Sequence, residues 1–170
     1  GKRMVNWDPE AKTVLSNEEV IHNQEQANLF HILYKLEGSE TEGIIIATQR
    51  PETIMVDSAV CVHPDDSRYT HLHGKRVIIP LINKSIPIIT DSYIDIEFGT
   101  GALKVTPAHD QNDYEIGKKH GLEIIDCLNE DGTLNENAQI LIGEDRFVAR
   151  KKIKPLLEEA GVLIKIEPYM

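Results

Sequence analysis

The sequence predicts an α+β fold, with a mixed and partly barrel-like β core and several peripheral helices. Short apolar runs separated by turn residues recur along the chain, whereas only a few segments have a helical pattern. The hydrophobic fraction is 41% and the aromatic fraction only 5%, so the core should consist mainly of Ile, Leu and Val. A chain of 170 residues is long enough to form one domain with its own core.

The first elements are a pair of strands and a short helix. Residues 31–36 and 43–48 are strand candidates, and the polar segment 37–42 between them is typical of a hairpin loop. Pro51 suits the first position of a helix, which we expect over 51–58. The polar, turn-rich residues 1–25 should form an extended segment that leads into the domain.

The remaining elements continue the mixture of strands and helices. Further strands are expected at 59–63, 76–80, 86–90, 102–107, 124–128 and 162–166. A short helix or a turn is expected to start at 64–67, a hairpin-like connection at 81–85 and a loop at 129–137. Helices should cover 111–120 and 144–160, because Gly121 and Gly161 stand where such helices would stop.

Charge and cysteine content narrow the possible partners. With a formal net charge of −10, the chain is not expected to wrap nucleic acid over its whole surface, so such contact would be local, for example a strand end entering a pocket. No signal peptide is present and no apolar run approaches the ~20 residues of a membrane span. Cys61 and Cys127 lie among apolar residues and predict buried free thiols in a reducing compartment, hence a cytoplasmic location. A structural zinc site would need further ligands.

Two strand-to-helix junctions carry the candidate chemistry. A small-residue turn at 99–101 leads into a strand, after which His109, Asp110 and Asp113 open a helix. The segment 47–53 has the same form, since it follows a strand and carries polar side chains around Pro51. Helix N-termini present outward-pointing amides on a rigid backbone. The two junctions together therefore suggest one pocket built from both.

Several interpretations of these residues stay open from spacing alone. His109, Asp110 and Asp113 fit metal ligands, an acid–base pair or a substrate clamp, but carboxylates also simply cap helix N-termini. Lys104 and Thr106 share a strand face that fits either solvent exposure or a pocket wall.

The interpretation of Arg50 and of Phe98 is also left open by the sequence pattern. Arg50 fits a surface cation or a binding residue, and Phe98 fits core packing or ligand stacking. No serine elbow, P-loop or dinucleotide fingerprint is present, which removes the commonest nucleophile and nucleotide motifs.

Six segments, taken together and in order, resemble one family. They are Arg-Met-Val-Asn-Trp-Asp-Pro at 3–9, Thr-Gln-Arg-Pro-Glu-Thr at 48–53, Ala-Val-Cys-Val-His-Pro-Asp-Asp at 59–66, Glu-Phe-Gly-Thr-Gly-Ala at 97–102, Thr-Pro-Ala-His-Asp-Gln-Asn-Asp at 106–113 and Asn-Glu-Asp-Gly at 129–132. This pattern resembles the editing domain inserted into the catalytic domain of valyl-tRNA synthetase. The isoleucyl and leucyl enzymes carry related insertions, and the segments around Arg50 and His109 favour the valyl branch over an isoleucyl-type domain.

The resemblance implies roles for the pocket residues. Asp113 would hold the substrate ammonium, Thr106 and Asp110 would lie near the threonine side chain and the ester, and Phe98 would pack on the terminal adenosine. Arg50 and Lys104 would meet the sugar-phosphate end or polarise the carbonyl. Further pocket residues would be Thr48, Gln49, Thr53 and His109. Gln49 departs from the family pattern, which has threonine there, so pocket size or rate should differ.

The implied activity is hydrolysis by water of the ester that joins threonine to mischarged valine tRNA, with no metal or cofactor. Threonyl-adenylate is an alternative further substrate. The partners would be the 3′ end of that tRNA and the remainder of the parent synthetase, with no membrane. Residues 1–170 would be one editing domain cut from a larger synthetase, monomeric when isolated. The chain lacks the two ATP-binding signatures of class I synthetases, so it would not aminoacylate. The alternatives are a module that binds the aminoacyl 3′ end without hydrolysis, and an unrelated metal hydrolase.

Overall fold

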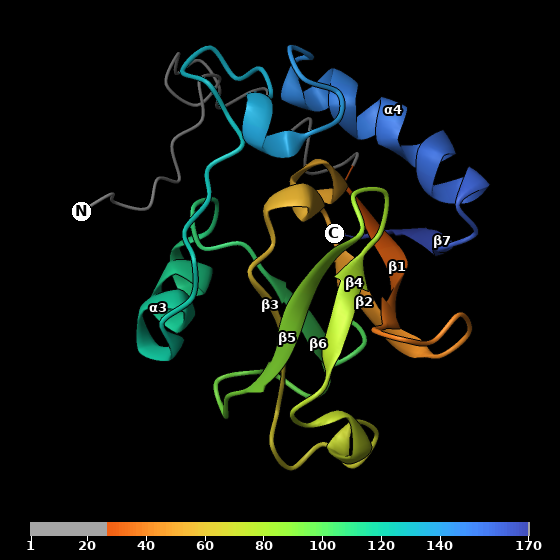
Figure 1. Ribbon diagram of the computed structural model, residues 1–170, viewed down its shortest axis with the longest axis vertical. Helices are drawn as coiled ribbons and strands as arrows, with labels where there is room; N and C mark the ends of the chain where they lie inside the picture. The colour runs from red at the N-terminus through yellow and green to blue at the C-terminus, as the bar shows by residue number, and fades with distance from the viewer. Residues whose placement is uncertain (1–26, 170) are drawn as a thin grey trace.

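A computed structural model describes residues 27–169, and within that range seven strands form one mixed sheet (Figure 1). The strands are β1 (Asn28–Leu36), β2 (Gly43–Thr48), β3 (Ala59–Val62), β4 (Arg76–Ile79), β5 (Lys84–Thr90), β6 (Ala102–Val105) and β7 (Leu163–Pro168). Their order is β2-β1-β4-β5-β3-β6, and β7 pairs with β1. All neighbours are antiparallel except β3 and β5, which are parallel.

The sheet is nearly closed into a barrel. β6, at one end of the strand order, lies against β2 at the other end. β1 pairs with β7 through its first half and with β4 through its last residues, so the two ends of β1 have different neighbours on the same edge. The interior contains mostly Ile, Leu and Val side chains, such as Ile32, Ile46 and Val60, all fully buried. The predicted fold class is confirmed.

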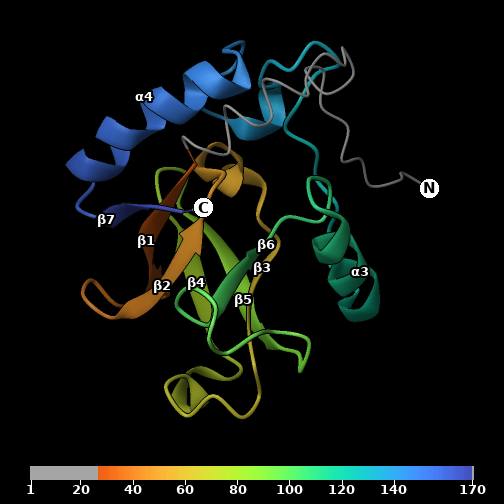
Figure 2. The ribbon, with the colours of Figure 1, turned by 180° about the vertical axis from the view of Figure 1, so that it is seen from behind.

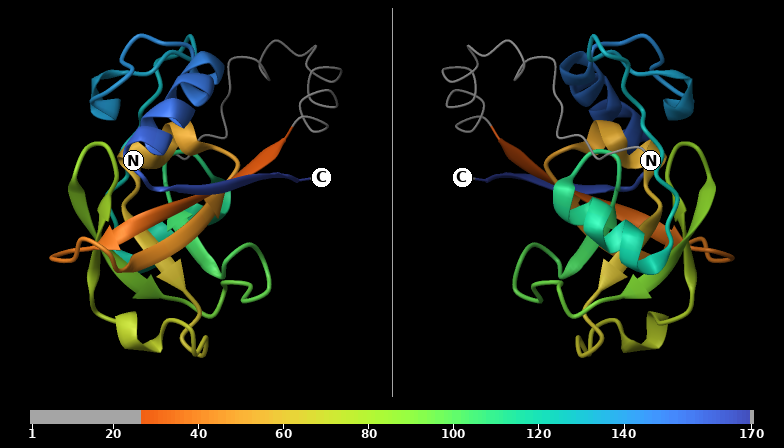
Figure 3. Two further views of the ribbon diagram at one scale, coloured as in Figure 1. Left: turned by 90° about the vertical axis from the view of Figure 1, so that its right-hand side faces the viewer. Right: turned by 90° about the vertical axis from the view of Figure 1, so that its left-hand side faces the viewer.

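The helices lie around the outside of this barrel. They are the 3₁₀ helices η1 (Pro51–Val56), η2 (Thr70–Leu72) and η3 (Glu136–Ala138), and the α-helices α3 (Gln111–His120) and α4 (Arg146–Glu159). α4 lies across one end of the barrel, over η1 (Figures 1 and 2). α3 lies beside the sheet next to β6 (Figure 3).

Local signals account for the bounds of α3. Asp110 is extended and its side chain accepts hydrogen bonds from the amides of Asn112 and Asp113, which makes it the N-cap. Gly121 ends the helix with φ of 67°, a conformation that glycine adopts without strain. The predicted helix at 111–120 is confirmed residue for residue.

One predicted helix ends earlier than expected, and one predicted strand is wrong. The expected helix at 51–58 is a 3₁₀ helix that stops at Val56, because Asp57 turns to an extended conformation. The expected strand at 124–128 is absent: the segment forms only one isolated bridge, at Leu128. Its backbone is held by side chains instead, since the amides of Asn135 and Asn137 donate to the Asp126 carbonyl. The segment expected at 1–25 lies outside the described residues.

Within residues 27–169, no helix combines the length and apolar character needed to cross a membrane. Both cysteines are free and buried, as predicted.

Candidate active site

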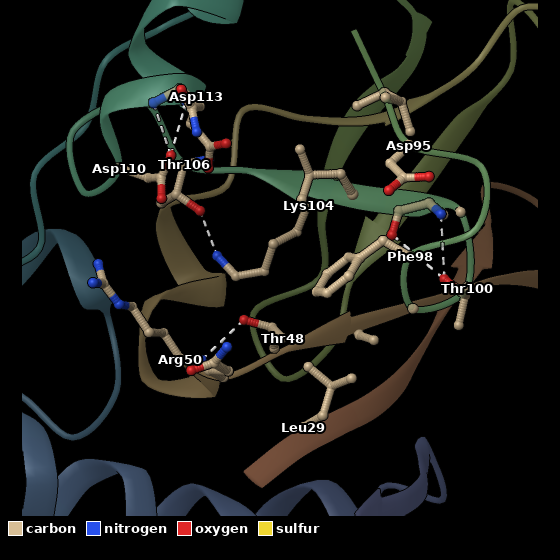
Figure 4. A pocket seen from close by; sticks show the side chains of 18 of the residues that line it. Leu29, Thr48, Arg50, Asp95, Phe98, Thr100, Lys104, Thr106, Asp110 and Asp113 are labelled. Carbon is tan, nitrogen blue, oxygen red and sulfur yellow. Dashed lines mark hydrogen bonds between the residues drawn. The ribbon is translucent and has the colours of Figure 1, made fainter. Parts of the chain in front are cut away.

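A cavity of about 450 Å³ opens between the end of β2, the loop before β6 and the start of α3 (Figure 4). All ten residues that the sequence marked out lie on its wall. They are Thr48, Gln49, Arg50, Thr53, Phe98, Lys104, Thr106, His109, Asp110 and Asp113. The two strand-to-helix junctions therefore share one pocket, while the roles of its residues stay predictions.

A buried lysine organises the base of the cavity. Lys104 is 5% exposed, so its strand face is not the solvated one that spacing alone left open. Its Nζ donates to Oγ1 of Thr53 at 2.9 Å, to Oδ1 of Asp57 at 2.7 Å and to Oγ1 of Thr106. An ammonium has three N–H bonds, so these acceptors use its full donor capacity.

Asp57 belongs to this buried cluster, and the sequence did not mark it out. It is fully buried behind the cavity, just after η1, and its carboxylate accepts from Lys104, from Thr106 Oγ1 at 2.8 Å and from the Tyr34 hydroxyl at 2.5 Å. Burial raises the pKa of the Asp57 carboxyl, and the Lys104 ammonium opposes that rise. The one signal in the sequence was a carboxylate directly after the apolar run Ile54-Met55-Val56, a place where an acidic side chain is buried only with partners.

Asp113 is the second buried carboxylate of the site. It is 7% exposed, and its Oδ2 accepts the backbone N–H of Thr106 at 2.9 Å. Burial raises its pKa to about 7, and the negative charge of Asp110 adds to the rise. Asp110 itself is half-buried and acts as the helix cap, which was the plainer interpretation of its spacing. Asp113 thus has a proton-binding equilibrium near neutral pH.

Arg50 joins the two junctions. Its Nη1 donates to the backbone carbonyl of His109 at 2.6 Å, although Arg50 is an exposed residue. Thr48 Oγ1 accepts the Arg50 backbone N–H, and Thr53 Oγ1 donates to the Arg50 carbonyl, each at 3.0 Å. The polar residues of this segment therefore fix the mouth of the cavity as well as line it.

His109 lies on the wall but turns its ring inward. Its Nε2 accepts the backbone N–H of Cys127 at 3.0 Å, so the ring is neutral. Burial lowers the pKa of His109 to about 4, and the nearby carboxylate of Asp126 opposes this. His109 thus does not converge with Asp110 and Asp113. Among residues 27–169, no group of three or more His, Cys, Asp or Glu side chains is placed to hold a metal ion.

Phe98 faces the cavity from the opposite side to Asp110 and Asp113 (Figure 4). Its ring is 43% exposed, which rules out the core-packing interpretation, and it meets Tyr169 edge-to-face at 5.8 Å. Thr100 anchors this loop to β2 by donating to the Ile45 carbonyl. Gly101 allows the loop to pass close to Arg68: its φ is +80°, and a Cβ there would lie 2.4 Å from Nη2 of that arginine.

The comparisons decide the family. The model described as "Leucyl-tRNA synthetase, editing domain" matches residues 65–152, which is just over half of the chain. The chain belongs to this editing-domain family. Its match includes the Phe98 loop and the β6–α3 junction, and leaves out the β2–η1 junction.

Relatives of this editing domain are valine–tRNA ligases. Those of Bacteroides fragilis and Bacillus subtilis are each 55% identical to it, over 169 and 171 residues, and the matches cover 99% and 100% of this chain. The chain spans 19% of the length of either relative. The resemblance to the editing domain of valyl-tRNA synthetase is confirmed.

Two solved structures share the fold of this editing domain. One is a leucyl-tRNA synthetase of Agrobacterium radiobacter K84 in a ternary complex with tRNA and LeuAMS, with a TM-score of 0.62 and 17% identity over 90% of this chain and 21% of that one. The other, described as GlLeuRS-CP1, has a TM-score of 0.62 and 12% identity over 84% of this chain and all of that one. At these identities the likeness concerns the fold.

Proposed function

We propose that this editing domain hydrolyses the ester that joins threonine to the 3′-terminal ribose of valine tRNA. The observation that carries the proposal is the polar, buried cluster of Lys104, Thr106 and Asp113 on the wall of one cavity. The 55% identity to valine–tRNA ligases supports the choice of tRNA. The parent synthetase has to discriminate between threonine and valine, and a polar cavity of this kind can do so.

Threonine and valine differ by a hydroxyl in place of a methyl group. An apolar synthetic site rejects the hydroxyl isostere only weakly, because little is lost when it enters. A site built from hydrogen-bonding groups discriminates the other way, since valine would leave those groups buried and unpaired. Thr53 and Thr106 present hydroxyl oxygens on the cavity wall that can accept a further hydrogen bond from a substrate hydroxyl.

The remaining substrate groups have complementary partners. We expect the Asp113 carboxylate to hold the threonine ammonium, and the exposed ring of Phe98 to stack on the terminal adenine. Arg50, at the cavity mouth, suits the sugar-phosphate end. Gln49 is exposed beside it and changes the border of the cavity rather than its base.

Water is the nucleophile in this proposal. The described residues on the cavity wall include no cysteine or serine, and burial raises the pKa of both Cys61 and Cys127 to about 12, which keeps them as thiols. Nζ of Lys104 donates to Thr106 Oγ1, while the Thr106 proton is directed at Asp57, so Lys104 is not placed to take that proton. Water attacks the ester carbon, the bond to the ribose oxygen breaks, and that oxygen takes a proton. The products are threonine and free tRNA, and a ribose hydroxyl of the tRNA helps to position the water.

The test is deacylation of Thr-tRNA(Val) beside Val-tRNA(Val), by the wild-type chain and by Asp113→Ala. We expect rapid loss of threonine only, reduced at least about 100-fold in the variant, because a buried charge-assisted contact to the substrate is removed. An Asp113→Ala variant that remains folded and fully active would remove Asp113 from the mechanism.

The same experiment separates hydrolysis from binding alone. If neither ester is lost while a non-hydrolysable threonyl-adenosine analogue still binds, the chain is a binding module that needs its parent for turnover. The rest of the synthetase and the tRNA are the partners in either case. A monomeric state and a cytoplasmic location stay predictions.

A further inference from the structure

The contacts of Asp57 give the cavity a property that its lining residues alone do not explain. Asp57 is fully buried and does not reach the cavity wall. Its Oδ1 accepts from both Lys104 and Thr106, at 2.7 and 2.8 Å, and its Oδ2 accepts from Tyr34. A buried ion pair is seldom the most stabilising choice for a core, because desolvation offsets the attraction. A role in the site is a better reason for its presence.

The pair fixes the direction of the hydrogen bonds around it. A carboxylate only accepts and an ammonium only donates. Thr106 has one hydroxyl proton, which it gives to Asp57, and one of its lone pairs takes a proton from Lys104. What remains for a ligand in the cavity is a lone pair, so Thr106 presents an acceptor and no donor.

Thr53 is held in the same way. Its hydroxyl donates to the Arg50 carbonyl and accepts from Lys104, so its proton is also already used. Both threonine hydroxyls beside Lys104 therefore offer only lone pairs to the cavity. A ligand group that carries its own proton fits this arrangement, and a methyl group does not.

We propose that Asp57 is a positioning residue that makes Thr106 a hydrogen-bond acceptor toward the cavity and thereby selects an aminoacyl side chain with a hydroxyl donor. This rests on the proposed function and names what sets its specificity. The threonine hydroxyl donates a hydrogen bond to the remaining lone pair of Thr106 Oγ1. The methyl group of valine cannot donate, so it leaves this lone pair without a partner and shielded from water. Lys104 acts in the same unit by holding Thr106 from the other side.

The variant that tests this is Asp57→Asn, which keeps the shape but removes the charge and adds a donor. Its carbonyl oxygen is kept toward the Lys104 ammonium, because an ammonium only donates, and its NH₂ then faces the Tyr34 hydroxyl. An uncharged oxygen holds the Thr106 proton less firmly than a carboxylate does, so Thr106 can turn that proton toward the cavity. The readout is the ratio of kcat/KM for Thr-tRNA(Val) to that for Val-tRNA(Val). We expect the ratio to fall at least about tenfold, the usual effect of losing one hydrogen bond to a substrate.

Glu52→Gln is the matched control. Glu52 is 1% exposed, lies on η1 and pairs with Arg150 away from the cavity. It undergoes the same change of a buried carboxylate to an amide, so it reports any general loss of packing. We expect its ratio to stay within about twofold of wild type, because it has no contact with Thr106. Equal ratios in Asp57→Asn and wild type would overturn the proposal.

Thr106 supplies a second route if Asp57→Asn does not fold. Thr106→Val removes the acceptor and should lower the ratio as Asp57→Asn does, whereas Thr106→Ser keeps the hydroxyl and should restore it. When the double variant Asp57→Asn/Thr106→Val folds, its loss should be no greater than the larger single loss, since both changes remove one interaction. A high ratio in Thr106→Val would contradict the proposal.

Failure of the proposed function can be distinguished from failure of the role that we assign to Asp57. If the wild-type chain hydrolyses neither ester, affinities for non-hydrolysable threonyl- and valyl-adenosine analogues replace the rates. A preference for the threonyl analogue that disappears in Asp57→Asn supports the assignment of Asp57 without any hydrolysis. An unchanged preference in that variant overturns it.

Discussion

Asp113 should make the stability of the domain depend on pH. Its pKa is raised from 3.8 to about 7, chiefly by burial, so the folded state keeps this proton over a range where the unfolded state has lost it. The favourable contribution of the protonated form is complete below pH 4 and is lost as pH rises through about 7. At pH 8 the domain carries a buried carboxylate whose natural counter-ion, in the proposed function, is the substrate ammonium.

The corresponding prediction concerns Asp113→Asn. The amide can still accept the Thr106 backbone N–H but cannot ionise. The variant should therefore gain stability relative to wild type between pH 5 and pH 8, by roughly 2 kcal/mol, since each unit of pKa shift is worth about 1.4 kcal/mol. Urea unfolding at the two pH values measures the difference. A difference that does not change with pH would show that Asp113 ionises normally.

The packing of α4 on η1 depends on an asymmetric ion pair. Glu52 is 1% exposed, and both its oxygens accept from Arg150, at 2.8 and 2.7 Å, whereas the arginine side chain is 29% exposed. The consequence of breaking the pair therefore depends on which partner is removed, because Glu52 is buried and Arg150 is partly exposed. A carboxylate left alone at the η1 site has no access to water, but the arginine can turn outward.

Arg150→Met should therefore cost more than Glu52→Gln. We expect a loss of about 3–5 kcal/mol for Arg150→Met and about 1–3 kcal/mol for Glu52→Gln, because only the former leaves an uncompensated buried charge. Chemical denaturation of the two variants and of the double variant gives the comparison. The double variant should be more stable than Arg150→Met alone, and equal losses for the two single changes would contradict this account.

The elements that sequence predicts well are those whose signals are local. β2 and α3 are predicted at their observed bounds because β2 is a short apolar run that follows a polar loop, and α3 is flanked by a cap at Asp110 and a stop glycine at Gly121. The strand expected at 124–128 was wrong because side-chain amides of Asn135 and Asn137 take the place of a neighbouring strand. Apolar pattern alone does not reveal which group will satisfy the backbone.

The same difference between local signals and long-range contacts applies to the candidate site. Family motifs mark the ten residues on the cavity wall, but Asp57 lies behind it, and its partner Lys104 is 47 residues away along the chain. The pairing exists only once β6 is folded beside β3 and η1. Sequence patterns also left Lys104 and Phe98 open, since their exposure is decided by how the barrel closes. Residues that act through another residue are the hardest to find from sequence.

The acidity of the domain bears on how the tRNA would be held. Its formal net charge is −10, so few phosphates can be neutralised on its surface. In the proposed function the domain binds the aminoacyl 3′ end locally, through Asp113, Phe98 and Arg50, and the rest of the synthetase carries the remainder of the tRNA. The chain accounts for 19% of the length of its relatives, which leaves room for such a division.

Salt dependence distinguishes this arrangement from extended binding. For the isolated chain, log KM for Thr-tRNA(Val) should rise with log salt concentration with a slope of about 1–2, because each neutralised phosphate contributes about 0.7–0.9. The parent synthetase should show a steeper slope, and a short threonylated stem that ends in the same 3′ strand should serve the isolated chain as well as whole tRNA. A slope as steep as that of the parent would mean that this domain contacts many phosphates of the tRNA beyond its 3′ end, contrary to what its charge predicts.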